Sequence, residues 1–246
     1  MRCLIIIPAY NEGGALKDVI DELNQSISGC EDTYEYVVIN DGSTDNTRKL
    51  CKDNNINCIS LPINLGIGGA VQTGYLYARK YEYDVAIQMD GDGQHLPKYL
   101  PSLIAPIKDG QADCVIGSRF CEGSEKDGFK SSLFRRMGIH FLCFIIKLAC
   151  GERVTDSTSG FRAVNKEGIR LFAKYYSKDF PEPEAIVLQK KYGLRTKEIP
   201  VVMRERLSGQ SSISLFSSMY YMIKVTLAVI IAGFEKKKDI NEVEEI

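Results

Sequence analysis

Short apolar runs alternate with segments of helical spacing throughout the first half of this 246-residue sequence. The run 3–7 has the length and β-branched content of a buried strand, and segment 14–27 spaces its apolar residues as an amphipathic helix does. Strands that alternate with helices predict an α/β fold with a mainly parallel central sheet flanked by helices. The expected strands are 3–7, 36–39, 58–61, 84–89 and 112–117, and the expected helices are 14–27, 43–53, 69–81 and 96–109.

A polar cluster follows each of the five expected strands. In open α/β sheets, ligands bind beyond the carboxyl ends of the strands, so five such clusters at one edge indicate a binding site. The clusters are residues 8–12, 41–45, 64–70, 90–95 and 117–119.

Asp90 and Asp92 are the side chains in these clusters that most directly indicate chemistry. Two carboxylates two positions apart at a strand end project to nearly the same side, and hard oxygen ligands suit Mg²⁺ or Mn²⁺ bridging to a diphosphate. Asp-Gly pairs are also typical of turns, and it is the four companion clusters that favour a metal site.

Several cationic side chains are candidates to bind an anion. The alternative for each arginine is a solvated surface charge. Arg206 opens a polar segment, 206–212, that would close over a diphosphate and exclude water. His95 is a candidate phosphate contact or a structural residue. The candidate arginines are Arg119, Arg135, Arg136, Arg204 and Arg206.

These clusters, in this order, resemble the family-2 glycosyltransferases, which have the GT-A fold of nucleotide-diphospho-sugar transferases. The resemblance spans about residues 1–215 and is strongest to dolichol- or polyprenyl-phosphate sugar transferases. Segments 5–12, 41–45, 89–95 and 117–119 match the family's opening, nucleotide, metal and Gly-x-Arg motifs, and 156–162, 198–201 and 206–211 resemble the acceptor loop and closing segment.

The resemblance implies a role for individual residues. A metal ion, Mg²⁺ or Mn²⁺, would be held by Asp90, Asp92 and Gln94 and would act as a Lewis acid on the leaving nucleotide diphosphate, with inversion at the sugar carbon. Asp92 is therefore expected to be catalytic, and Asp90 and Gln94 to contact the donor as well. The residues implied to bind base, ribose and phosphate are Pro8, Tyr10, Glu12, Asp41, Arg119 and Arg206, with Arg135 as a further candidate.

The acceptor is less clearly indicated. Ser212 stands where polyprenyl-phosphate transferases often carry lysine, which counts against a phosphate acceptor. Glu184 begins a helix where relatives with hydroxyl acceptors place a general base, and Asp156 is its weaker rival. A hydroxyl needs such a base, whereas an acceptor phosphate is already ionised. Glu184 is equally consistent with a carboxylate at a helix N-terminus, where the helix dipole favours a negative charge.

The last part of the chain differs from the expected transferase domain, 1–212. Segment 213–234 is apolar, but Lys224 at its centre would cost about 2.5–3.5 kcal/mol inside a bilayer. An amphipathic helix at a membrane interface is therefore the first expectation, packing on a membrane protein or a second copy is the next, and a membrane span comes last. Residues 235–246 form a charged tail.

A net charge of −1 argues against nucleic acid as a partner. The eight cysteines, none spaced Cys-x-x-Cys, are expected to be reduced thiols. The sequence thus predicts an inverting glycosyltransferase that is peripheral at the cytoplasmic face of the cell membrane and uses a nucleotide-sugar donor and a lipid-linked acceptor. The alternatives are a soluble or polysaccharide hydroxyl acceptor, and then a nucleotidyltransferase or an inactive membrane-associated binding module.

Overall fold

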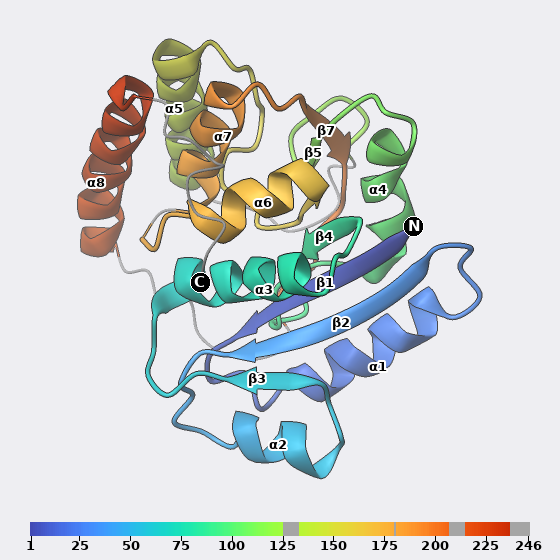
Figure 1. Cartoon of the computed structure of the whole chain (residues 1–246). Helices are drawn as coiled ribbons and strands as arrows, with labels where there is room; N and C mark the ends of the chain where they lie inside the picture. Colours follow the sequence, from blue (N-terminus) through green and yellow to red (C-terminus); the bar gives the residue numbers. More distant parts are fainter. Residues whose placement is uncertain (125–132, 180, 207–214, 237–246) are drawn as a thin grey trace.

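The structure is a computed structural model that describes residues 1–124, 133–179, 181–206 and 215–236 (Figure 1). Of residues 133–135 and 215–221 it describes the backbone only.

A seven-stranded sheet forms the centre of the molecule, in the order β3-β2-β1-β4-β6-β5-β7. All neighbouring strands pair parallel except β6, which lies antiparallel between β4 and β5. The strands are β1 (Arg2–Ala9), β2 (Thr33–Asn40), β3 (Cys58–Ser60), β4 (Val85–Gln88), β5 (Cys114–Ser118), β6 (Arg162–Asn165) and β7 (Thr196–Pro200).

Helices cover both faces of the sheet (Figure 1). Cys3, Ile5 and Ile7 of β1 pack into the core on the α1 and α4 side, whereas Leu4 and Ile6 pack on the α3 and α6 side. Because both faces are buried, β1 reads as a continuous apolar run. The helices are α1 (Leu16–Ile27), α2 (Thr47–Asp53), α3 (Gly66–Lys80), η1 (Pro97–Tyr99), α4 (Leu100–Lys108), α5 (Leu133–Cys150), α6 (Lys166–Lys174), α7 (Pro181–Lys191) and α8 (Leu215–Phe234).

The expected α/β fold is confirmed, and the alternation of strands and helices in the first half is found as expected. The sequence did not indicate that β6 would insert between two parallel strands. Its register pairs Arg162 with Gln88 of β4 on one side and with Ile116 of β5 on the other. Because β6 runs antiparallel, the loop that precedes it lies at the edge where β4 and β5 end.

Three helices, α5, α7 and α8, form a separate layer beside the sheet (Figure 1). Val225 and Val229 of α8 are fully buried in a cluster with residues of α5, α7 and β5. The apolar C-terminal segment is therefore a helix that packs on its own chain. Among the described residues, no helix combines the length and hydrophobicity needed to cross a membrane.

Candidate active site

The candidate site lies at the sheet edge where β1, β2 and β4 end. Asp41 follows β2 and Asp90 and Asp92 follow β4, with β1 between them in the sheet. Asp41 is 3% exposed and its Oδ1 accepts a hydrogen bond from the backbone N–H of Leu65, 2.7 Å away. Four of the five polar clusters therefore meet here.

The loop after β1 is locked to the loop after β2 through Asn11. The Asn11 side-chain oxygen accepts hydrogen bonds from the backbone N–H of Thr44 (2.9 Å) and Asp45 (3.3 Å). Its own N–H donates to the Ser43 hydroxyl, and its φ of 58° is a left-handed conformation that asparagine tolerates. This arrangement leaves Tyr10 48% exposed beside the edge, where a flat ligand could stack on it.

His95 supports the turn that carries the two aspartates. Its Nδ1 accepts a hydrogen bond from the Asp90 backbone N–H at 3.0 Å, and its ring stacks on Phe161 with centroids 4.9 Å apart. At 4% exposure it is a structural residue, the second of its two interpretations. Gln94 closes the same turn, since its N–H donates to Asp92 Oδ1, and its side-chain amide donates to the Arg204 carbonyl.

Three carboxylates converge at this turn. Burial raises the pKa of Glu12 to about 7, with the charges of Asp92 and Asp90 adding to it and Arg206 opposing it. Burial, and then the charge of Asp90, also raises the pKa of Asp92. Glu12 Oε2 is buried and has no hydrogen-bond partner among the described residues. Buried carboxylates with raised pKa values and one unpartnered oxygen are suited to a cation.

Arg206 places a positive charge beside these three carboxylates. Its Nε lies 3.1 Å from Asp92 Oδ2. Within the described ranges, no group of three or more His, Cys, Asp or Glu side chains is arranged to hold a metal. Asp90 and Asp92 nevertheless fit Mg²⁺, which is commonly bound through one or two carboxylates and completes its shell with substrate phosphates and water.

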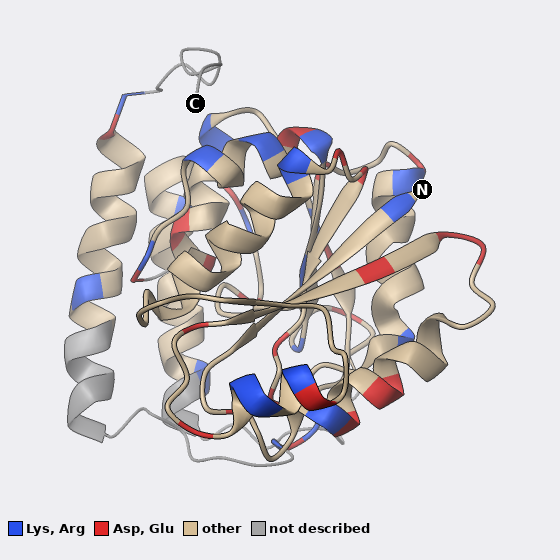
Figure 2. Ribbon diagram, turned by 60° about the horizontal axis from the view of Figure 1, so that its bottom comes forward, with Lys and Arg blue, Asp and Glu red and all other residues tan. Residues whose placement is uncertain are grey.

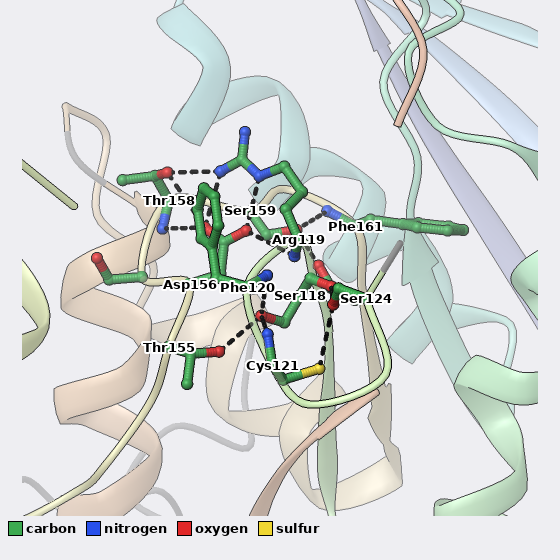
Figure 3. Close-up of polar contacts among 12 residues, drawn as sticks. Ser118, Arg119, Phe120, Cys121, Ser124, Thr155, Asp156, Thr158, Ser159 and Phe161 are labelled. Atoms are coloured by element: carbon green, nitrogen blue, oxygen red, sulfur yellow. Dashed lines mark hydrogen bonds and ion pairs between the residues drawn. The ribbon is translucent and has the colours of Figure 1, made fainter. Parts of the chain in front are cut away.

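Arg119 and Asp156 form a hydrogen-bonded ion pair (Figure 3). Arg119 Nε and Nη2 donate to the two Asp156 carboxylate oxygens, each at 2.7 Å, and Nη2 also donates to the Thr158 hydroxyl. Glu198 accepts hydrogen bonds from the backbone N–H of Thr155 and Asp156. Burial would raise the pKa of Asp156, but Arg119 outweighs it and holds that pKa below its ordinary value. This geometry favours a structural pair over a general base.

The two glutamates at the start of α7 point to different places. Glu184 accepts a hydrogen bond from the Ser177 hydroxyl at 2.6 Å and lines a cavity of about 210 Å³ between α7 and the end of α8. Burial raises the pKa of Glu182, which is hydrogen-bonded to Gln88 and interacts with Arg162 and Asp90. Residues two positions apart on a helix lie about 200° apart around its axis, so only one of them faces the aspartates. Glu182 was not expected from the sequence, because helical spacing alone does not say which face of α7 turns inward.

The remaining arginines fall into separate groups. Arg204 pairs with Glu22 of α1 and donates to the Gly93 carbonyl, so it anchors the start of the closing segment. Arg136 lies over the Phe120 ring, 5.8 Å from its centroid. The Arg135 side chain, Ser212 and the rest of 207–214 lie outside the described residues.

Comparisons with known proteins place the sequence among glycosyltransferases. The sequence model described as Glycosyl transferase family 2 matches residues 4–172. The chain is 33% identical, over 80% of its length and 83% of the relative's, to UDP-N-acetylglucosamine–dolichyl-phosphate N-acetylglucosaminyltransferase of Methanococcus voltae. It is 29% identical to undecaprenyl-phosphate mannosyltransferase of Micrococcus luteus, over 87% and 88% of the two chains.

Solved structures show the same fold. Glucosyl-3-phosphoglycerate synthase of Mycobacterium tuberculosis, in complex with Mn²⁺, UDP and glucosyl-3-phosphoglycerate, superimposes with a TM-score of 0.71 at 17% identity. The match covers 96% of this chain and 81% of that one.

Proposed function

Since the chain belongs to glycosyl transferase family 2, we propose that it transfers a sugar from a nucleotide diphosphate donor to a polyprenyl phosphate, with inversion at the sugar carbon. The observation that carries the proposal is the meeting of Asp41, Glu12, Asp90 and Asp92 at one sheet edge, with Arg206 beside them. The choice of acceptor is supported by two relatives, one named for a dolichyl phosphate and the other for an undecaprenyl phosphate.

The donor would occupy the edge between the ends of β1, β2 and β4. Tyr10 offers an exposed ring on which the base can stack, and Pro8, Glu12 and Asp41 surround the position of the ribose. Asp90 and Asp92 would hold Mg²⁺ or Mn²⁺, which when bound stabilises the charge of the leaving nucleotide diphosphate. Arg206 would exchange its contact with Asp92 for a donor phosphate, while Gln94 and His95 keep the turn in place.

The contacts of the carboxylates near the site are also consistent with a phosphate acceptor. An acceptor phosphate is ionised at neutral pH and needs no general base. Asp156 is occupied by Arg119, and Glu184 is turned toward Ser177 and α8. Arg135 and Arg136, at the start of α5, are the cations we propose for the acceptor phosphate.

The second candidate function is transfer to a hydroxyl, and Glu182 is the observation that favours it. Burial raises the pKa of Glu182, and Glu182 interacts with Asp90, as a general base in the site would. Replacing Glu182 by glutamine separates the two. Transfer to polyprenyl phosphate would survive the change, whereas transfer to a hydroxyl would be lost.

The test of the donor site compares Asp92→Asn with Asp53→Asn, an exposed carboxylate on α2. Thermal unfolding would be followed with nucleotide sugars in the presence and absence of Mn²⁺. We expect a metal-dependent rise in Tm for the wild type and Asp53→Asn, and none for Asp92→Asn, which should also lose transfer. An equal rise in all three proteins would refute the assignment.

A further inference from the structure

Two cysteines meet in a surface cavity that the proposed function does not use. Cys51 belongs to α2 and Cys58 to β3, and both line a cavity of about 580 Å³ beside the loop that follows β2. Cys51 is 3% exposed, whereas Cys58 is only partly buried. Both are free thiols in this structure. The cavity therefore holds a pair of thiols of which one is accessible and the other is covered.

A hydrogen bond that Cys51 donates to Cys58 joins the two thiols. This bond lowers the pKa of Cys58 to about 7 against the opposing effect of burial, and the Ser60 hydroxyl and the charge of Arg48 lower it further. The same bond, and then burial, raises the pKa of Cys51 above its ordinary value. Because the thiolate is the nucleophile in cysteine chemistry, Cys58 is the thiol of this pair that would attack first.

The turn between α2 and β3 brings this pair together. The chain reverses after α2, and the backbone N–H of Ile56 donates to the Cys51 carbonyl at 2.9 Å, which places Cys58 at the start of β3 beside Cys51. Cys143 and Cys150 have the same separation in sequence, but both lie on α5, where seven residues span about 10 Å along the axis. A disulfide needs Cα atoms within about 7 Å of each other, so the pair on α5 cannot form one.

The charges around the cavity favour a negatively charged molecule. Arg48, Lys49 and Lys52 of α2 line it together with a single carboxylate, that of Asp45. Within the described part of the chain, Lys49 pairs with Asp53, and neither Arg48 nor Lys52 has a carboxylate partner. The helix α2, at the bottom of Figure 1, comes forward in Figure 2 and shows more blue than red. A cluster of cations beside an accessible thiol raises the local concentration of an anion that can react with it.

We propose that Cys58 and Cys51 form a thiol–disulfide exchange site that takes an anionic low-molecular-weight disulfide, with Arg48 and Lys52 as the cations that receive its negative charges. The Cys58 thiolate attacks one sulfur of that disulfide, the S–S bond breaks, and one thiolate leaves. Cys51 then loses its proton to solvent, attacks Cys58 Sγ and expels the second thiolate. The two cysteines are thereby oxidised to a disulfide, and the small disulfide is reduced to two thiols that take up the two protons.

A chain of contacts leads from this exchange site to the candidate active site. Cys58 Sγ lies 3.8 Å from the Ser60 hydroxyl, which accepts a hydrogen bond from the Asn40 side-chain amide at 3.1 Å. The Asn40 side-chain oxygen accepts one from the backbone N–H of Ser43, and the Ser43 hydroxyl accepts one from that of Asn11. A disulfide would take Cys58 Sγ out of this chain, so we expect it to weaken Mn²⁺-dependent binding of nucleotide sugar by about fivefold. Only this effect rests on the proposed function.

Mass spectrometry of the full chain tests the exchange. The reduced protein would be incubated at pH 7 with glutathione disulfide, which is anionic, or with cystamine, a cationic disulfide, and free thiols would then be blocked with iodoacetamide. Trypsin places the two cysteines in separate peptides, 50–52 and 53–79. We expect the wild type to give these peptides linked by a disulfide and Cys51→Ser to give 53–79 carrying one glutathione. Cys143→Ser is the matched control and should behave as the wild type does. By intact mass, glutathione disulfide should react about tenfold faster than cystamine at low salt, and Arg48→Gln/Lys52→Gln should remove that preference.

A wild type in which Cys58 stays a free thiol would overturn the proposal, and so would a mixed disulfide at Cys58 that Cys51 never displaces. Equal rates with the two small disulfides would exclude an anionic ligand. The Mn²⁺-dependent rise in Tm with nucleotide sugar is measured on the reduced protein, on the oxidised protein and after reduction with dithiothreitol. We expect oxidation to weaken this response and reduction to restore it, and an unchanged response in the disulfide form would exclude the link to the candidate active site. No response in the reduced protein would instead contradict the proposed donor chemistry, while the linked peptides would still decide the exchange.

Discussion

Removing the Arg119 side chain should destabilise the protein far more than removing an arginine with the same geometry at the surface. Asp156 is fully buried and Arg119 is 11% exposed. Arg119→Ala leaves the Asp156 carboxylate buried with only backbone and hydroxyl donors. Breaking a buried pair from one side typically costs about 3–5 kcal/mol. We expect about 3 kcal/mol here, because the Arg119 and Thr158 backbone N–H groups still donate to Asp156.

Arg195 provides the matched control. It also donates from Nε and Nη2 to both oxygens of one aspartate, Asp113, at 2.9 and 3.0 Å, but its side chain is 57% exposed. An exposed pair of this kind contributes little to stability, because water screens both charges. In urea unfolding, Arg119→Ala should therefore lower the midpoint by roughly 1 M and Arg195→Ala by a few tenths of that.

The pH dependence of the stability difference between wild type and Arg119→Ala provides a second test. The pKa of Asp156 is lowered in the folded protein, so the pair contributes stability that is fully present above the unfolded pKa, about 3.9. That stability is lost as the pH falls through the lower folded value. Without Arg119, burial raises the Asp156 pKa, so the variant regains stability as the pH falls and Asp156 takes up a proton. The difference from wild type should be largest near pH 7 and smaller at pH 5. Equal losses of stability in Arg119→Ala and Arg195→Ala would refute the reasoning. So would a stability difference between wild type and Arg119→Ala that does not change with pH.

Three further predictions concern other parts of the chain. His95→Ala should weaken Mn²⁺-dependent nucleotide binding about tenfold by calorimetry, because the Asp90 turn loses its Nδ1 acceptor; unchanged affinity would contradict the role given to the ring. Gly68→Ala should lower the free energy of unfolding by about 1–3 kcal/mol, since its Cβ would lie 2.0 Å from the Ser177 carbonyl, whereas Gly138→Ala meets only flexible Met222 and should be tolerated. Cys58, whose pKa is lowered by a hydrogen bond from the Cys51 thiol, should react with iodoacetamide at pH 7 before buried Cys114, whose pKa burial raises; mass spectrometry showing the reverse order would exclude this.

The meeting of the polar clusters at one edge of the sheet could be predicted because its signals are local. Parallel strands bring their carboxyl ends to one edge, so residues such as Asp41 and Asp90 that directly follow strands meet without knowledge of the strand order. The periodicity of the first half rests on the same short-range rule, and the α/β fold that it predicted is confirmed. The family that the motifs resemble is confirmed as well.

The other half depends on contacts between distant segments. Placing Asp156 against Arg119 requires the loop before β6 to return to the end of β5, and the sequence carries no signal for a strand inserted antiparallel between β4 and β5. Glu182 and Glu184 share one helix start, and which of them faces Asp90 is decided by how α7 packs. The same holds for α8, whose apolar composition indicated a membrane or a partner but not that Val225 and Val229 would pack on the chain's own helices and leave the other face exposed.

The two halves of the site therefore differ in how they can change. The residues proposed to bind the donor lie in adjacent loops that are joined by hydrogen bonds, such as those of Asn11 with Thr44 and Asp45, and a substitution there disturbs several loops at once. The proposed acceptor side is carried by α5, α7 and α8, which contact one another through a third cluster that also includes Ile116 of β5. Changes in that layer can alter the acceptor without moving Asp90 or Asp92. On this reasoning, relatives that share the donor turn can differ in the acceptor they use, and the acceptor is better inferred from the three helices than from the aspartates.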